Sequence, residues 1–164
     1  LPTMSLSEII KIFGSRGFSV QEMVALSGAH TIGFSHCKEF SSNIYNYSSA
    51  LESDPSYNPR FAAALRNACA DYKKNPTLSV FNDVMSPNKF DNKYFQNLPE
   101  GLGVLSSDRS LHSDGRKRPD VELYAKDQDV FIKAFGLAMQ QVSEYGVKTG
   151  GEGGIRRRCD AFNN

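Results

Sequence analysis

The spacing of hydrophobic residues along this chain predicts helices almost throughout. In residues 4–15 and 128–145, apolar side chains recur every three or four positions, which gathers them on one face of a helix. Residues 55–73 show the same pattern. We therefore expect a mostly α-helical fold.

A further helix is expected to begin after Ser19. Ser19 and Glu22 have the spacing of a capping box, in which the hydroxyl accepts from an early backbone N–H and the carboxylate reaches back to the cap. Met23, Leu26 and His30 then follow at helical intervals. His30 is therefore predicted to share the apolar face of this helix.

The segments between the helices are rich in residues that favour turns. Residues 76–92 contain several Pro, Asn and Asp and are predicted to form a loop, followed by one or two helical turns at 93–98. Residues 101–108 are expected to be turn-like or briefly extended, and residues 149–154 to form a flexible turn. No repeat or internal boundary interrupts the pattern, so we expect one domain.

Composition and net charge give no support for a nucleic-acid or membrane partner. The 164 residues carry 19 Lys and Arg against 18 Asp and Glu, a formal net charge of +1. Such a balance does not attract a polyanion or an anionic lipid surface. No apolar run approaches the roughly 20 residues that a membrane-spanning helix needs.

Three cysteines, Cys37, Cys69 and Cys159, leave two arrangements open. One internal disulfide with one unpaired thiol, and three free thiols, both fit an odd number. The Asn-Tyr-Ser sequence at 46–48 is an acceptor site for N-glycosylation, which favours a secreted glycoprotein.

His30 is the first candidate for chemistry, and two interpretations of it are open. A single histidine on an apolar helix face is commonly a hydrogen-bonded core residue. Small residues precede it, however, and Gly28 and Ala29 would let a flat ligand lie against the helix. An imidazole on an apolar face beside small residues suits the axial ligation of haem iron.

Residues 24–37, VALSGAHTIGFSHC, resemble the haem-ligand motif of the class III plant peroxidases. The resemblance extends over essentially the whole chain and implies the haem-peroxidase fold, with haem b as cofactor. It makes His30 the axial ligand of the iron on the proximal side. The positions that it implies next to the cofactor are Gly28, Ala29, Ile32, Gly33 and His36. For His36, a contact to a haem propionate and a place on the surface are both open.

The same resemblance gives the cysteines separate roles. It implies a disulfide between Cys37 and Cys69, whose spacing is similar to that of a family bridge. It also pairs Cys159 with a cysteine in the N-terminal half of the family's domain. We therefore expect residues 1–164 to be the C-terminal, proximal haem-binding half of such a peroxidase, with the distal half absent from this sequence.

A second candidate site lies in the sequence DVMSPNKFDN, residues 83–92. Taken alone, its carboxylates and hydroxyl are typical either of a solvated acidic loop or of the hard oxygen ligands that Ca²⁺ prefers. The resemblance adds Thr31, the residue directly after the proposed iron ligand, to the ligands of this loop, so an ion bound here would set the height and tilt of His30. The resemblance implies a calcium site made of Thr31, Asp83, Ser86, the Lys89 carbonyl and Asp91.

Asp108, in the sequence GLGVLSSDRSL, is compatible with a surface turn or a helix cap when it is considered alone. The resemblance implies instead that it accepts a hydrogen bond from the nitrogen of His30 that does not bind iron. Such a bond gives the imidazole partial imidazolate character. A more basic ligand stabilises the oxidised iron that peroxidase chemistry needs.

Two positions need separate comment: Asn82 departs from the family pattern, and Pro2 is expected at a site whose upstream residues are not in this sequence. The family often has a large apolar residue just before the first calcium Asp, near the haem histidine, whereas this chain has Asn82 there and Phe81 one residue earlier. Pro2 is similar to a proline near the family's aromatic-donor site, and is the one substrate residue that the resemblance implies.

The resemblance implies a haem peroxidase that reduces hydrogen peroxide while it oxidises phenolic donors, secreted to the cell wall or located in the vacuole. The distal His and Arg that act on peroxide in the family have no counterpart here, so we expect the isolated chain to be inactive. The alternative is a non-catalytic half-domain that binds haem and calcium or has a structural role.

Overall fold

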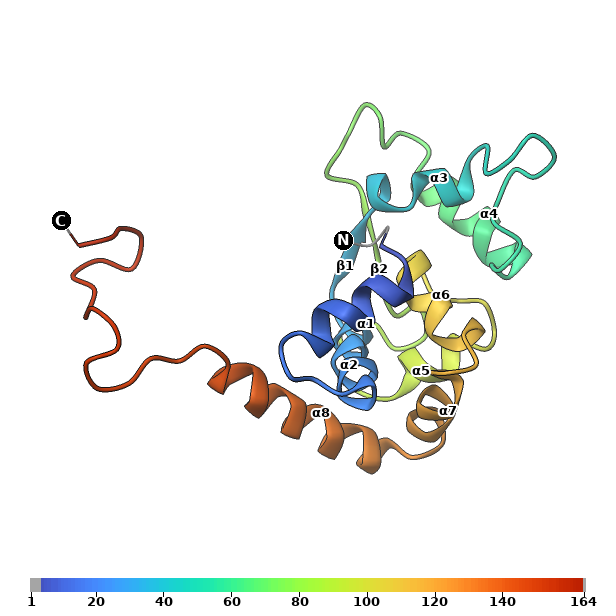
Figure 1. The fold of residues 1–164 in the computed structure, drawn as a ribbon. Coiled ribbons are helices and arrows are strands. Elements are labelled where there is room, and N and C mark those ends of the chain that lie inside the picture. The colour runs from blue at the N-terminus through green and yellow to red at the C-terminus, as the bar shows by residue number, and fades with distance from the viewer. Residues whose placement is uncertain (1–3, 164) are drawn as a thin grey trace.

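Helices make up most of residues 4–163, the part of the chain that the computed structural model describes (Figure 1). The mostly α-helical class predicted from the sequence is confirmed. Among these described residues, no helix is both long and apolar enough to cross a membrane. In chain order the helices are α1 (Leu6–Gly14), α2 (Val20–Ser27), α3 (Ser41–Ile44), α4 (Pro59–Ala68), α5 (Lys93–Asn97), α6 (Ser106–Ser113), α7 (Arg118–Lys126) and α8 (Gln128–Glu144).

Capping boxes define the start of the first two helices. Ser5 and Glu8 form one at α1, and the predicted box of Ser19 and Glu22 is present at α2. At α2 the Glu22 amide donates to Ser19 Oγ at 3.2 Å, and the Ser19 amide donates to Glu22 Oε2 at 2.7 Å. These contacts satisfy backbone N–H groups that a helix start otherwise leaves unpaired.

The prediction that α2 continues to His30 is wrong. The α-helix ends at Ser27, and the chain tightens into a 3₁₀ turn, Gly28–Thr31, which carries His30. A Cβ on Gly28 would lie 2.4 Å from Phe131 Cε2 and 2.8 Å from Phe95 Cε2, so α8 and α5 closely approach the backbone here. The space beside Gly28 is therefore filled by rings of the protein itself.

Most of the other predicted helices are present. Those expected at 4–15, 93–98 and 128–145 are confirmed as α1, α5 and α8. The helix expected at 55–73 is shorter, because α4 begins at a proline capped by Asn58, and proline is tolerated only in the first turn.

Three helices were not predicted. α3 and α7 are short, and α7 buries only Val121 and Tyr124, too few apolar positions to produce a periodic pattern. α6 begins inside the segment expected to be turn-like, so Asp108 lies in the first turn of a helix. The Leu105 amide donates to Asp108 Oδ2 at 3.2 Å, which stabilises this helix start.

Two short strands correct the expectation that residues 76–92 form only a loop. β1 (Phe34–His36) pairs with β2 (Ser79–Phe81) in an antiparallel ladder. β1 follows the 3₁₀ turn that carries His30, and β2 ends two residues before Asp83. The pairing therefore brings the acidic loop to the turn that holds the candidate iron ligand.

Two clusters of buried side chains form the core. The larger lies among α1, α2, α5, α6, α7 and α8, and the smaller lies beneath α3 and α4, in the upper lobe of Figure 1. The disulfide between Cys37 and Cys69 that the resemblance implied is present in the smaller cluster, with a Cα–Cα distance of 5.6 Å. The strand pair connects the two lobes.

Helix α8 packs on the larger cluster along only part of its length. Phe131 and Ala138 are fully buried, whereas Val142, which helical spacing puts on the same face, is 42% exposed. The residues after α8 extend away from the bundle (Figure 1), and Cys159 is an exposed free thiol among them. The apolar face of this helix is thus only partly covered by the described chain.

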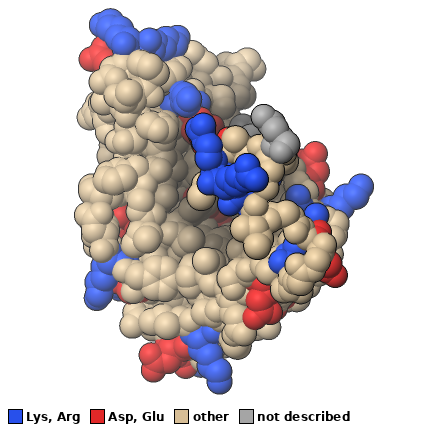
Figure 2. All heavy atoms as spheres, turned by 90° about the vertical axis from the view of Figure 1, so that its left-hand side faces the viewer, with Lys and Arg blue, Asp and Glu red and all other residues tan. Residues whose placement is uncertain are grey.

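The face of the molecule on the side of the C-terminal segment is mostly uncharged (Figure 2). Acidic and basic side chains lie mainly around its margin, with one group of basic side chains near the middle.

Gly28→Ala is expected to lower the free energy of unfolding by about 1–3 kcal/mol, because the added methyl group overpacks the contact with two buried rings. Urea denaturation followed by circular dichroism measures this change.

Gly136→Ala is the matched control, because nothing lies within 4 Å of the Cβ it would add on the exposed side of α8. This substitution should stabilise the protein by about 1 kcal/mol, the difference in helix propensity between the two residues. Equal effects of the two alanines would contradict the packing role assigned to Gly28.

Candidate functional site

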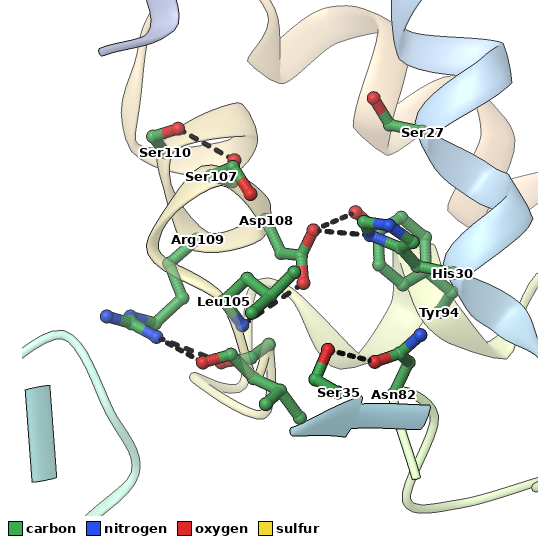
Figure 3. Close-up of polar contacts among 12 residues, drawn as sticks. Ser27, His30, Ser35, Asn82, Tyr94, Leu105, Ser107, Asp108, Arg109 and Ser110 are labelled. Atoms are coloured by element: carbon green, nitrogen blue, oxygen red, sulfur yellow. Dashed lines mark hydrogen bonds and ion pairs between the residues drawn. The ribbon is translucent and has the colours of Figure 1, made fainter. Parts of the chain in front are cut away.

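His30 and Asp108 face each other between the 3₁₀ turn and α6 (Figure 3). Their Nδ1 and Oδ1 atoms are 2.8 Å apart, and the Asp108 side chain is 2% exposed. Because a carboxylate only accepts, Nδ1 of His30 carries the proton of this hydrogen bond. Among the described residues nothing hydrogen-bonds Nε2 of His30, and 38% of this side chain is exposed.

Asp108 accepts from two further donors. The Tyr94 hydroxyl donates to the same oxygen, Oδ1, at 3.0 Å, and the Leu105 amide donates to Oδ2 at 3.2 Å. Figure 3 shows the Asp108 carboxylate directed at His30 and Tyr94 together. The buried carboxylate is thus held by donors from three separate parts of the chain.

Opposing effects act on the pKa of His30. Burial lowers it, whereas the charge of Asp108 and the hydrogen bond to it raise it, and the resulting pKa lies above the ordinary value of 6.5. Burial and the charge of Asp108 both raise the pKa of Tyr94 well above its usual range. The Tyr94 phenol therefore keeps its proton and acts as a donor.

A largely apolar cavity of about 400 Å³ lies beside this pair. Its size is within the range of small-molecule and cofactor sites. Its walls come from α1, α2, the 3₁₀ turn and α6. Among the described residues, the only ring nitrogens in the wall belong to His30. The lining residues are Met4, Ile9, Ile12, Phe13, Leu26, Ser27, His30, Leu105, Ser107, Asp108 and Leu111.

The features that fit a haem group are the apolar cavity and the unpaired Nε2 of His30 among the described residues, and not the small residues Gly28 and Ala29. An apolar wall with one imidazole whose second nitrogen is already hydrogen-bonded is the arrangement that axial ligation requires. The other positions expected next to the cofactor do not line the cavity. Gly28 faces buried rings, Ala29, Ile32 and His36 are exposed, and Gly33 forms a left-handed turn with a φ of 85°.

The five residues expected to bind calcium converge next to His30. Thr31 Oγ1 lies 3.4 Å from Asp83 Oδ2 and 3.3 Å from the Lys89 carbonyl oxygen. Ser86 Oγ lies 3.2 Å from Asp83 Oδ2 and 3.0 Å from Asp91 Oδ1. We call these five residues the oxygen cluster.

The charges of the oxygen cluster fit a hard cation. Asp83 and Asp91 are 1% and 4% exposed, and the one cation that pairs with them in the described part of the chain is the exposed ammonium group of Lys89, 3.5 Å from Asp91. No three His, Cys, Asp or Glu side chains of the described chain form a metal-binding group. The cluster instead combines two carboxylates with hydroxyl and carbonyl oxygens, the donor set of calcium sites.

Asparagine side chains hold both sites in place. The Asn97 amide on α5 donates to Asp83 Oδ1 at 2.8 Å. Asn82 donates to the Ile32 carbonyl at 3.3 Å and accepts from Ser35 Oγ at 2.6 Å (Figure 3). Asn82 therefore joins β1 to the segment after β2.

The ring next to His30 belongs to Tyr94. Its ring stands edge-on to the imidazole, with centroids 6.0 Å apart and an interplanar angle of 82°. Phe81 instead stacks on Phe34, with centroids 4.4 Å apart. Asn82, at the position where the family often has an apolar residue, contributes hydrogen bonds rather than a ring.

Arg109 anchors the start of α6 next to Asp108. The guanidinium group pairs with Asp54 at 2.9 Å and donates to the Gly103 and Val104 carbonyls at 3.2 and 3.0 Å. It also lies 3.7 Å from the centroid of the Tyr57 ring. This nearly buried side chain fixes the turn that presents Asp108 (Figure 3).

Sequence reasoning missed Tyr94, Asn97 and Arg109. Tyr94 and Asn97 are three residues apart, the helical interval that puts both on one face of α5, so their spacing was the available signal. Arg109 carried no such signal, since the side chains that it contacts, Asp54 and Tyr57, lie far away in the sequence. Pro2, expected at a donor site, lies outside the described residues.

Comparison with known proteins gives matches over the whole chain. The sequence profile of the peroxidase family matches residues 1–127. Among curated relatives from Arabidopsis thaliana, Peroxidase 63 is 63% identical over 99% of this chain and 48% of its own length. Peroxidase 31 and Peroxidase 6 are 60% and 53% identical, each over 99% of this chain and 50% of its own length. The chain spans about half the length of these curated relatives.

Asp108→Asn is expected to lower the pKa of His30 below 6.5, because burial then acts on the imidazole without the opposing charge. An NMR titration of the protein without added cofactor measures this pKa. His36 and His112 are the two other histidines and serve as internal references.

The sign of the pH dependence of stability follows from the same pair. A histidine whose pKa is raised in the folded state stabilises that state below its unfolded pKa of about 6.5, and this contribution is lost as the pH rises through the folded pKa. The wild-type protein should lose free energy of unfolding over that interval, and Asp108→Asn should not. Parallel curves for the two proteins would contradict this role of Asp108.

Proposed function

Because this chain belongs to the peroxidase family, in its class III plant branch, we propose that it supplies the proximal half of a haem site in an enzyme that reduces hydrogen peroxide. In this proposal residues 1–164 are the C-terminal half of the enzyme. The electron donors are phenolic compounds, and the protein is secreted to the cell wall or located in the vacuole.

One observation carries the proposal: the partly buried hydrogen bond between His30 Nδ1 and Asp108 in the wall of an apolar cavity. The bond fixes the tautomer, so Nε2 has a lone pair and no competing partner among the described residues. This is the arrangement of a metal-binding histidine whose second nitrogen is oriented by a carboxylate.

The residues of this chain bind, orient and tune the cofactor. Haem, when bound, supplies the redox-active iron at which hydrogen peroxide is reduced. His30 would hold the iron from one side, while Asp108 holds the proton on Nδ1 and increases the basicity of the ring. The apolar side chains of α1, α2 and α6 would exclude water from the same side.

The acid–base groups that act on peroxide are proposed to come from residues outside this sequence. The cavity wall contains no histidine other than His30 and no arginine among the described residues. Such groups are needed to move the peroxide proton and to stabilise the departing oxygen. The isolated chain is therefore proposed to be inactive, and Cys159 to pair with a cysteine of that other half.

The oxygen cluster is proposed to hold a calcium ion. A divalent cation would neutralise two nearly buried carboxylates whose one cationic partner among residues 4–163 is the exposed ammonium group of Lys89. Since Thr31 belongs to the cluster and follows His30 directly, the ion would also restrain the 3₁₀ turn that presents the imidazole.

His30→Ala is expected to lower the haem affinity by at least about 100-fold, because it removes the ligand itself. Mutation of a residue that only hydrogen-bonds to a metal ligand already lowers metal affinity by about 10–100-fold. Haem titration followed by absorbance near the Soret region measures this affinity. His112→Ala, which removes a histidine outside the cavity, should leave it unchanged.

Added imidazole should restore the wild-type spectrum to His30→Ala by occupying the position of the missing ring.

The proposed inactivity of the isolated chain has its own test. With hydrogen peroxide and a phenol, the haem-loaded isolated chain should turn over no faster than free haem. A wild-type chain that gives no Soret band would favour a structural half-domain instead.

Removing calcium is expected to lower the melting temperature, because a ligand at 100 times its Kd stabilises the folded state by about 2.7 kcal/mol. Asp83→Asn should abolish this calcium-dependent difference, since it removes a central carboxylate of the oxygen cluster. Asp71→Asn, at an exposed carboxylate that pairs with Lys74, is the control that should retain it. An equal response in both variants would exclude the oxygen cluster as the calcium site.

A further inference from the structure

We propose that Tyr94 tunes the donor strength of His30 by sharing the carboxylate oxygen to which the imidazole is hydrogen-bonded. This inference rests on the proposed function, in which His30 binds the haem iron. It makes Tyr94 a positioning residue that acts through Asp108 and opposes the effect of that carboxylate.

The geometry places two donors on one oxygen. Asp108 Oδ1 accepts from His30 Nδ1 at 2.8 Å and from the Tyr94 hydroxyl at 3.0 Å, while Oδ2 accepts from the Leu105 amide. Figure 3 shows both dashed contacts meeting at the same atom. The phenol and the imidazole therefore compete for the negative charge of one buried group.

This competition has a defined direction. A hydrogen bond to the charged form of a carboxylate stabilises that form and makes the oxygen a weaker base. A weaker base pulls less on the Nδ1 proton, so His30 keeps less imidazolate character while Tyr94 donates. Asp108 raises the electron density on the ring, and Tyr94 limits how far it is raised.

Tyr94 is held rigidly enough to act in this way. Its side chain is 2% exposed and packs against the Phe95 ring, with centroids 5.0 Å apart. Helix α5, which carries it, is fixed at both ends: Asn92 donates to the Tyr124 and Ala125 carbonyls, and Asn97 donates to Asp83 of the oxygen cluster. The phenol is thus preoriented toward Asp108.

Tyr94→Phe tests the proposal, because it removes the hydroxyl and keeps the ring. In the full protein that contains this chain, loaded with haem, the Fe(III)/Fe(II) midpoint should move to a lower potential, since a more basic ligand favours ferric iron. The iron–histidine stretching frequency in the resonance Raman spectrum should rise. Asp108→Asn should move both quantities in the opposite direction.

Tyr124→Phe is the matched control. Tyr124 belongs to the same buried cluster, but its hydroxyl donates to the Gln21 carbonyl at 3.4 Å and does not contact Asp108. Loss of this hydroxyl should leave the midpoint and the stretching frequency unchanged. Tyr94→Phe should also have no effect in an Asp108→Asn background, because the two groups act through one oxygen.

A readout without haem separates this inference from the proposed function. In the cofactor-free protein, the NMR signal of the His30 Nδ1 proton should move downfield in Tyr94→Phe and remain in place in Tyr124→Phe. If the wild-type protein fails to bind haem, the proposed function is wrong, and this shift still tests the sharing of Asp108. An unmoved Nδ1 proton signal, or an unmoved midpoint in a protein that binds haem, would overturn the role of Tyr94.

Discussion

The buried carboxylate of Asp108 imposes the constraint on which the surrounding structure depends. A charge removed from water must be met by hydrogen bonds, and here the donors are His30, Tyr94 and the Leu105 amide. They come from the 3₁₀ turn after α2, from α5 and from the start of α6. The orientation of the His30 imidazole is therefore set by three elements that must pack together before the hydrogen bonds can form.

Two further buried carboxylates, Asp83 and Asp91, lie near the same turn. Asp83 accepts from Thr31, which follows His30 in the chain, and Asp91 accepts from Ser86 of the same oxygen cluster. The cluster and the imidazole are therefore joined through one 3₁₀ turn. Helix α5 contacts both sites, because Tyr94 donates to Asp108 and Asn97 donates to Asp83. Under the proposed function, a cation and a haem iron would be bound to adjoining residues, Thr31 and His30, of one 3₁₀ turn.

The two lobes hold the 3₁₀ turn that carries His30 and Thr31 in position. The strand pair of β1 and β2 brings the acidic loop to the turn, and the Cys37–Cys69 disulfide lies in the smaller cluster next to β1. On the other side, Arg109 links the first turn of α6 to Asp54 and to the carbonyls before the helix. A metal-binding histidine needs a fixed ring orientation of this kind if a hydrogen bond is to tune its basicity.

The sequence by itself determined the features that depend on residues close together in the chain. The capping box of Ser19 and Glu22, helix α8 and the class of fold follow from contacts within a few positions, and the motif around His30 is contiguous. Only the tertiary structure decided where α2 ends, because the rings that approach Gly28 belong to α5 and α8. It also decided the pairing of β1 with β2 and the roles of Tyr94 and Arg109. Those features depend on contacts between charged and aromatic side chains from distant segments. A local pattern of hydrophobic and polar residues does not specify which distant residue each of them contacts.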